Sequence, residues 1–528
     1  MKKIFNIAIA LLGFAAVACV DLSPEVYTDV RKEDYFSTPA QFSTLIANAY
    51  SQLAGEYGYV YREGFWSLQE YTSDEVVVPT RVTDWYDGGV PIAMHTHTWL
   101  SDTRDINNGW SFAYGGVTKC NTVIDNIRTI AGEDESAYSD AAKAGLAEAK
   151  ILRAFYHLLA MDVYGNVHID DGEREIKQYT RKEVFEWIEQ ELLENIEKVD
   201  DTVRYGSMTR PVAYMILAKL YLNAEVYTGT PRWSDAETYL DKIISVEDGG
   251  QGGYGYDLND DYFATFTTNN TGNKEIIFPI VFDSVYANGN MFHLITNHYA
   301  MRDVFGFTTD CWNGPCTLGS FYALYSDNDI RRNQWFVGPV YNTPADWKTI
   351  VYNRASWTGD IVEWDHGDSH FQVIIDPEVT TIQDPTGANS CEGARFVKFQ
   401  FENGIAHHAD SDFPIYRYAD VLLMKAEARM RQKNGAVDDV ALECVNKVHR
   451  RAGLADYSAA DLTYAELLAE RGRELAWEGH RRDDQIRFGT YGGTWEFKSA
   501  SDKNHELFPI PNWVRDAAPG VYTQNPGY

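Results

Sequence analysis

The chain has 528 residues, of which 77 are acidic and 46 are Lys or Arg, so its formal net charge at pH 7 is −31. This charge excludes nucleic acid as a partner and electrostatic attachment to an anionic membrane, because both depend on clustered Lys and Arg. Aromatic residues make up 14% of the chain, including 14 Trp and 34 Tyr. Flat surfaces on which a ligand can stack are therefore plentiful.

Residues 1–18 have the layout of a bacterial secretion signal. Lys2 and Lys3 precede an apolar run from Ile4 to Val17, and a small residue stands directly before Cys19. The apolar run is shorter than the ~20 residues that span a bilayer, which favours a cleaved signal over a permanent span. A plain secretion signal needs no cysteine at this point, whereas a lipoprotein signal needs a thiol that accepts diacylglycerol. We therefore predict that residues 1–18 are removed and that Cys19 carries a lipid anchor.

Apolar residues recur at helical spacing along much of the remaining chain. Ile151, Ala154, Phe155, Leu158 and Leu159 follow the pattern of one helix face. Another helix is expected to start at 209–211 with Pro in its first turn, and the next is expected to be capped by Ser234. Such a pair occupies about 35 residues, the size of a tetratricopeptide unit. Similar helices are expected at 40–53, 110–130, 181–199, 416–431, 437–451 and 464–480.

The helical period is lost between residues 248 and 412. Gly, Asn, Asp, Thr and aromatic residues dominate there, with strand-like runs at 275–282 and 395–401. Ligand-contacting residues tend to lie on such loops, because a rigid repeat array holds them in place. The prediction is a mainly α fold in which a tetratricopeptide-like helix-pair scaffold, an α-solenoid over 38–247 and 413–490, is interrupted by a loop-rich, non-repeat ligand-binding region over 248–412. No linker divides residues 19–528, which we expect to form one unit.

Five sequence strings, taken together and in this order, are highly specific. They are AKILRAFY at 149–156, FPIYRYADVLLMKAE at 413–427, ERGRELAWEG at 470–479, LFPIP at 507–511 and the terminal QNPGY at 524–528. With these strings the chain resembles the SusD/RagB family of outer-membrane nutrient-binding lipoproteins, which includes starch-binding SusD-like proteins. It departs from the family pattern at two places. His168 stands where Pro is usual, and DDQI at 483–486 stands in place of the Trp-Asp-Leu that is usual near the last helix.

The resemblance implies four tetratricopeptide-like helix pairs and a non-repeat region that carries the ligand site. It also implies a lid-like partnership with a SusC-like TonB-dependent transporter in the outer membrane, with the lipid-anchored protein facing the cell exterior. Members of the family have no catalytic activity, so no catalytic residue, cofactor or resident metal is expected. The expected ligand is a glycan, either an oligosaccharide or a polysaccharide.

Two segments offer the flat aromatic faces and planar polar groups that glycan binding requires. In the first, Trp85 stands between carboxylates on a loop that ends in two glycines. In the second, Trp312 lies in a tight Asn-Gly-Pro turn. For each Trp the alternative is packing in the core. Sugar-binding members have a Trp and an Arg in the first segment, a Trp in the second and a further aromatic residue. By this resemblance we nominate Arg81, Trp85, Tyr299 and Trp312 as ligand-binding residues, with Asp84 and Asn313 as their polar neighbours.

Other clusters favour structural roles, with alternatives left open. The turn between Cys311 and Cys316 could close a disulfide, and a zinc site is the weaker alternative there. The sequence His95-Thr-His97 would place two imidazoles on one face of a strand, where ordinary structural histidines are more common than metal ligands. Asp412 could cap a following helix, with calcium binding at 410–412 as the alternative. The charged run 470–487 is interpreted as a structural ion-pair face.

Three functions are compatible with these sequence features. Glycan capture for a transporter comes first, and a peptide-binding RagB-like lipoprotein, with an elongated groove and fewer exposed Trp, is its rival within the family. A surface glycoside hydrolase would need two suitably spaced carboxylates. Among 77 acidic residues some pair always meets that condition, so their number is no argument, and no hydrolase, metalloprotease or phosphate-loop motif occurs.

Replacement of Cys19 with Ser should move the protein from the membrane fraction to the soluble periplasm, because the variant lacks the thiol that accepts the lipid. Fractionation followed by immunoblotting measures this shift. A Cys19→Ser protein that still sediments with the outer membrane in cells without the partner transporter would refute lipid anchoring.

Overall fold

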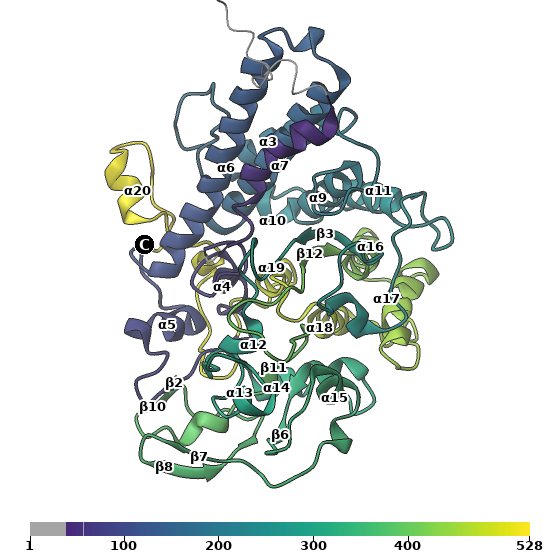
Figure 1. Cartoon of the computed structure of the whole chain (residues 1–528). Helices are drawn as coiled ribbons and strands as arrows, with labels where there is room; N and C mark the ends of the chain where they lie inside the picture. Colours follow the sequence, from purple (N-terminus) through teal and green to yellow (C-terminus); the bar gives the residue numbers. More distant parts are fainter. Residues whose placement is uncertain (1–37, 56) are drawn as a thin grey trace, which may run out of the picture.

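The computed structural model describes residues 38–55 and 57–528 (Figure 1). The predicted signal and Cys19 lie outside this part of the chain. Within the described residues, no helix combines the length and apolarity needed to cross a membrane. The fold is mainly α, as predicted, and its strands are short.

Long helices form the scaffold in the upper half of Figure 1. Helix α6 (Arg104–Ala131) packs on α7 (Asp140–Tyr164), α3 (Pro39–Tyr50) contacts both, and α8 (Arg181–Asn195) packs on α7. A second row runs from α9 (Arg210–Leu222) through α11 (Trp233–Ile243) to α16 (Tyr418–Gln432) and α17 (Asp439–Arg451). Helices from both sides of the loop-rich region 248–412, called the insert from here on, thus share one row.

Local sequence explains where these helices begin. Thr180 and Glu183 form a reciprocal capping box at the start of α8. Pro211 lies in the first turn of α9, where its missing N–H costs nothing. Asp438 caps α17 by accepting a hydrogen bond from the Ala441 N–H at 2.8 Å. The predicted stripe on α7 is part of a helix buried on nearly all sides, because α3, α6 and α8 surround it.

Several expected helix boundaries were wrong by a few residues, and two of the differences have a clear local basis. Helix α11 begins at Trp233 with Arg232 as its N-cap residue, so Ser234 lies inside its first turn. Helix α18 (Tyr464–Leu475) ends before the predicted residue 480, because Trp477 adopts φ 61° and its ring enters the core. The other helices of the described part are short: α4 (Phe65–Glu70), α5 (Val90–Thr96), α10 (Ala224–Thr228), α12 (Phe292–Ile295), α13 (Met301–Val304), α14 (Gly319–Tyr322), α15 (Trp347–Tyr352), α19 (Arg481–Arg487) and α20 (Asn512–Ala517).

The strands of the described residues pair into six two-stranded sheets. The longest pair joins β3 (Ile276–Ile280) of the insert to β12 (Phe413–Arg417), which leads into α16. Asp412 therefore precedes a strand and caps no helix; its carboxylate accepts hydrogen bonds from the Phe282 N–H at 2.8 Å and the Tyr205 hydroxyl at 2.8 Å. The other pairs are β1 (Val76–Val77) with β4 (Cys316–Thr317), β2 (Thr80–Arg81) with β10 (Gln383–Asp384), β5 (Trp335–Phe336) with β11 (Arg395–Phe396), β6 (Gly338–Pro339) with β9 (Ile374–Ile375), and β7 (Glu363–His366) with β8 (Ser369–Gln372).

A buried ion-pair network joins the insert to the C-terminal helices. Its side chains are almost fully removed from solvent, so the run 470–487 contributes ion pairs to the interior and not only to a helix surface. Arg331 of the insert lies 2.8 Å from Glu470 and 3.0 Å from Glu474. Lys398 lies 2.5 Å from Glu478. The network comprises Glu275, Asp329, Arg331, Lys398, Arg417, Arg451, Glu470, Glu474 and Glu478.

Glu474 lies at the centre of this network. Burial by itself would raise the pKa of its carboxyl, but Arg451, Arg417 and Arg331 lower that pKa to about 2. Because the folded-state pKa is depressed, the stabilisation is fully present above the ordinary pKa of about 4.3 and is lost as the pH falls toward 2.

The substitution Glu474→Gln should lower the free energy of unfolding by about 3–5 kcal/mol at neutral pH, because it removes a counter-charge that three buried guanidinium groups share. Urea denaturation measures the change. The matched control is Glu186→Gln, which removes an exposed carboxylate 3.8 Å from Lys182 on α8 and should change stability by less than about 0.5 kcal/mol. Equal losses in the two variants would contradict a central role for the network.

Candidate functional site

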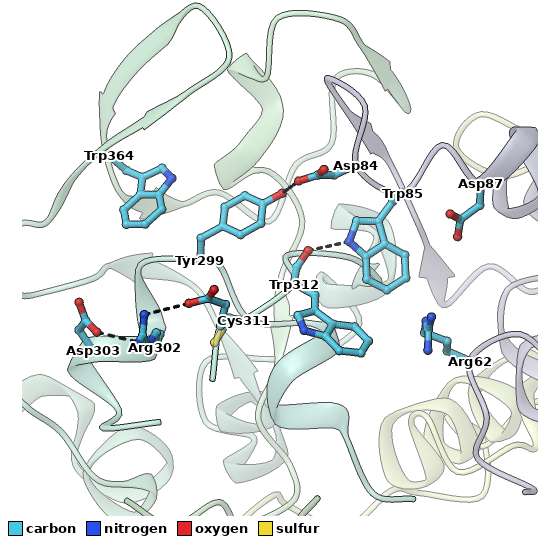
Figure 2. A pocket seen from close by; sticks show the side chains of 11 residues that line it. Arg62, Asp84, Trp85, Asp87, Tyr299, Arg302, Asp303, Cys311, Trp312 and Trp364 are labelled. Atoms are coloured by element: carbon cyan, nitrogen blue, oxygen red, sulfur yellow. Dashed lines mark hydrogen bonds and ion pairs between the residues drawn. The ribbon is translucent and has the colours of Figure 1, made fainter. Parts of the chain in front are cut away.

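Four half-buried aromatic side chains surround one cavity of about 530 Å³ (Figure 2). They are Trp85, Tyr299, Trp312 and Trp364, and we call the space between them the first cavity. Figure 2 shows Trp364 beside Tyr299 at one end and Trp85 beside Trp312 toward the other. The insert supplies three of the four residues, and the loop after β2 supplies Trp85. The volume lies within the range of about 300–1,000 Å³ that is usual for ligand sites.

The two tryptophans of the predicted segments contact each other. The Trp85 indole N–H donates a hydrogen bond to the Trp312 carbonyl at 2.6 Å, and the ring centroids lie 6.4 Å apart. The backbone N–H groups of Trp312 and Gly314 donate to the carbonyls of Leu294 and Ile295 in α12, at 2.8 and 2.7 Å. This turn is therefore tied to a helix, and its Trp312 side chain lines the cavity instead of filling the core.

Tyr299 carries the polar contact of the opposite wall. Its hydroxyl donates a hydrogen bond to the Asp84 carboxylate at 2.6 Å. Burial, followed by this hydrogen bond and the Asp84 charge, raises the pKa of Tyr299, so the phenol stays protonated. The ring stacks on Trp364, with centroids 6.2 Å apart and planes inclined by 16°. The pair presents a flat surface with a fixed polar group at its edge.

Two nominated residues do not reach the cavity, and in that respect the expectation was wrong. Arg81 is fully buried, and its guanidinium donates to the Glu392 carbonyl at 2.8 Å. Asn313 is also fully buried, and its amide donates to the Ser390 carbonyl at 2.9 Å. Both side chains hold the loops that carry Trp85 and Trp312, because each binds backbone carbonyls of the segment 390–392. They position the site from beneath.

Trp364, Arg62 and several charged residues at the rim of the cavity were not predicted from the sequence. Trp364 had a usable signal, since it stands between Glu363 and Asp365 and shortly before a glycine, the same arrangement that singled out Trp85. Arg62 had none, because nothing local distinguishes it. Its guanidinium lies 5.1 Å from the Trp312 ring centroid and 5.8 Å from that of Trp85. The charged residues of the cavity are Arg62, Asp84, Asp87, Arg302, Asp303 and Asp310.

The loop that carries Trp85 has an unusual backbone. Val82, Trp85 and Asp87 have φ values of 58°, 62° and 44°, in the left-handed region that residues other than glycine seldom adopt. Such conformations cost about 1–3 kcal/mol each and are concentrated at functional sites. The surrounding contacts therefore fix the loop at the expense of local strain.

The other candidate clusters are structural. Cys311 and Cys316 are free thiols, so the disulfide that the sequence left open is not formed. Cys316 lies in β4, which pairs with β1, and packs in a small apolar cluster separate from the main core that contains Cys311. His95 lies on α5 and not on a strand, and its ring nitrogens contact the carbonyls of Val76 and Glu496 at 3.1 and 2.8 Å. Across residues 38–55 and 57–528, no group of three or more His, Cys, Asp or Glu is placed to hold a metal ion.

The substitution Gly314→Ala should displace the Trp85 ring, because a β-carbon at position 314 would stand 2.2 Å from two atoms of that ring. We expect a loss of about 1–3 kcal/mol in unfolding free energy and a changed near-ultraviolet circular dichroism spectrum. The control is Gly253→Ala, where a β-carbon meets no atom within 4 Å. A Gly314→Ala protein with unchanged stability and spectrum would show that the Trp85 ring does not lie against this turn.

Comparisons with known proteins agree with the fold and the motifs. A family profile described as "SusD family" matches residues 295–528, and one described as "Starch-binding associating with outer membrane" matches residues 26–222. The chain is 25% identical over 399 residues to the starch-binding protein SusD of Bacteroides thetaiotaomicron, covering 69% of each chain. It is 23% identical to the SusD-like protein P2 of Formosa agariphila over the whole of both chains.

Solved structures share the fold at lower sequence identity. Surface glycan-binding protein A from Bacteroides uniformis has a TM-score of 0.70 at 20% identity, with 92% of this chain and 99% of that one covered. The Bacteroides thetaiotaomicron protein of the same name, solved in complex with laminarihexaose, has a TM-score of 0.66 at 22% identity, with 93% and 100% covered. With both profiles matched in order along the chain, this protein belongs to the SusD/RagB family.

Proposed function

We propose that this protein is a cell-surface lipoprotein that binds an oligosaccharide or polysaccharide and delivers it to a SusC-like TonB-dependent transporter. The first cavity is the observation that carries this proposal. Flat aromatic faces match the C–H faces of sugar rings, while the Asp84 carboxylate and the Arg62 guanidinium offer hydrogen-bond partners for hydroxyl groups. The starch-binding relative and the neighbour solved with laminarihexaose support a glycan as the ligand class.

The same arrangement favours binding over chemistry. The cavity carboxylates already have partners, because Asp84 accepts a hydrogen bond from Tyr299 and Asp310 pairs with Arg302 at 3.0 Å. A glycosidase needs one carboxyl group as a proton donor and a second as a nucleophile or base on the other side of the scissile bond. We therefore assign no catalytic role to these residues, in keeping with the glycan-binding names of the relatives.

The proposed cellular setting follows from the family. One matched profile is described as associating with the outer membrane, and the proposed lipid on Cys19 would hold the protein at that membrane facing the exterior. A receptor tethered by one lipid cannot itself move a nutrient across a membrane, so a transporter barrel completes the proposal. A peptide ligand is the weaker alternative, because the aromatic walls present stacking faces in place of an extended backbone-binding edge.

The substitution Trp312→Ala should abolish detectable glycan binding while leaving stability nearly unchanged. Loss of a central aromatic contact typically costs about 2 kcal/mol or more, or about 30-fold in affinity. Native affinity gels containing a panel of polysaccharides, starch and laminarin included, measure binding, and thermal unfolding measures stability. Trp513→Ala removes a 49% exposed Trp on α20 and is the matched control.

Two results would count against Trp312 as a glycan-binding residue. Normal retardation of the Trp312→Ala protein would remove Trp312 from the site. Unfolding of the variant would identify Trp312 as a core residue, whose loss costs about 3–5 kcal/mol. Failure of every polysaccharide in the panel to retard the unmodified protein would reject glycan binding itself.

A further inference from the structure

A second cavity of about 670 Å³ adjoins the first. Arg62 and Trp312 line both cavities and thus form their common wall. Each cavity alone has the volume of an ordinary small-molecule site. The ligand proposed for the first cavity is a chain of repeating units, so a neighbouring cavity of similar size could bind further units of the same chain.

The second cavity differs from the first in its chemistry. Its remaining walls include Tyr286, Asn288, Met291 and His407, with no carboxylate among the described residues that line it. An aromatic ring and a thioether supply apolar surface, and the amide and imidazole groups can hydrogen-bond to hydroxyl groups. This mixture suits an uncharged sugar ring.

The walls of the second cavity are held by contacts within the protein. The Gly55 N–H donates to the Asn288 carbonyl at 2.5 Å, and Asp283 and Ala287 exchange backbone hydrogen bonds at 3.0 Å. The Ser284 N–H donates to the Asp410 carboxylate at 2.6 Å. These hydrogen bonds fix the backbone of the turn at residues 283–288, which carries Tyr286, although 90% of Tyr286 is exposed to solvent. A large aromatic side chain displayed in this way is ready to stack on a ligand.

The common wall of the two cavities consists of Arg62 stacked on Trp312. The Arg62 guanidinium lies over the Trp312 ring and is held 2.9 Å from the Glu63 carboxylate. Figure 2 shows Arg62 and Trp364 at opposite ends of the first cavity. A chain that stacks along the aromatic residues from Trp364 to Trp312 thus leaves the first cavity at its border with the second.

We infer that the second cavity binds the continuation of the same glycan chain, which crosses the Arg62–Trp312 wall. This inference rests on the proposed function, since it places further units of the ligand of the first cavity. The protein therefore selects for chain length: short oligosaccharides use the first cavity alone, and longer ones gain contacts with Tyr286 and its neighbours.

The test compares ligand lengths in two variants. The polysaccharide that retards the unmodified protein most strongly is partly hydrolysed and fractionated into a ladder from disaccharide to octasaccharide, and calorimetry measures each affinity. Tyr286→Ala removes the displayed ring, and Ala287→Trp fills the cavity. Both should weaken the longest oligosaccharides by about tenfold, the effect of one lost stacking contact, and leave the shortest unchanged. Trp513→Ala is the control for loss of an exposed aromatic side chain.

The outcomes separate a subsite in the second cavity from an effect on the first cavity. Unchanged affinity for all lengths in both variants would overturn the second cavity as a subsite, and equal weakening of short and long oligosaccharides would place the effect in the first cavity. Either result leaves the proposed function standing as long as Trp312→Ala still abolishes binding. Absence of binding by the unmodified protein would instead reject the proposed function, and this inference with it.

Discussion

The buried ion-pair network fixes the insert on the helical scaffold, and the candidate site depends on that attachment. Glu470, Glu474 and Glu478 receive Arg331 and Lys398 from the insert. Removing charges from water is expensive, and the cost is offset only when partners and hydrogen bonds are complete. A displaced insert would leave these charges unpaired in the interior. Compared with an apolar interface of the same shape, the network adds little stability to the observed position of the insert. Its main effect is to make other positions of the insert unfavourable.

The path from the network to the cavity is short. Phe396, two residues before Lys398, stacks on Trp477 with ring centroids 4.4 Å apart. The Phe396 backbone N–H donates to the Thr296 hydroxyl at 3.0 Å. The carbonyl of the next residue, Asn297, accepts a hydrogen bond from the Asn313 N–H at 2.9 Å. Trp312 is thus only a few contacts from buried charges. Close packing transmits any shift of this core to the wall of the cavity.

Features with a local signal could be predicted from the sequence, whereas features that depend on partners distant in the chain could not. Helical periodicity and family strings predicted the fold class, and the Asn-Gly-Pro turn indicated that Trp312 would lie outside the core, where it lines the first cavity. By contrast, Arg81 and Asn313 bind carbonyls that lie 311 and 77 residues away in sequence, so no local pattern could place them beneath the site. Arg62 lies near Trp312 only because the insert folds back onto the N-terminal helices.

The buried position of Arg81 explains how the loop after β2 keeps its strained backbone. A β-branched residue such as Val82 at φ 58° is sterically unfavourable, and a free loop would relax to another conformation. Here the Val82 N–H donates to the Asp384 carbonyl at 2.7 Å, and the guanidinium of the preceding residue, Arg81, binds the Glu392 carbonyl. These contacts hold the Trp85 ring at the wall of the first cavity without a ligand. A stacking surface that is already ordered loses less entropy on binding, which favours affinity for a ligand that offers few strong contacts.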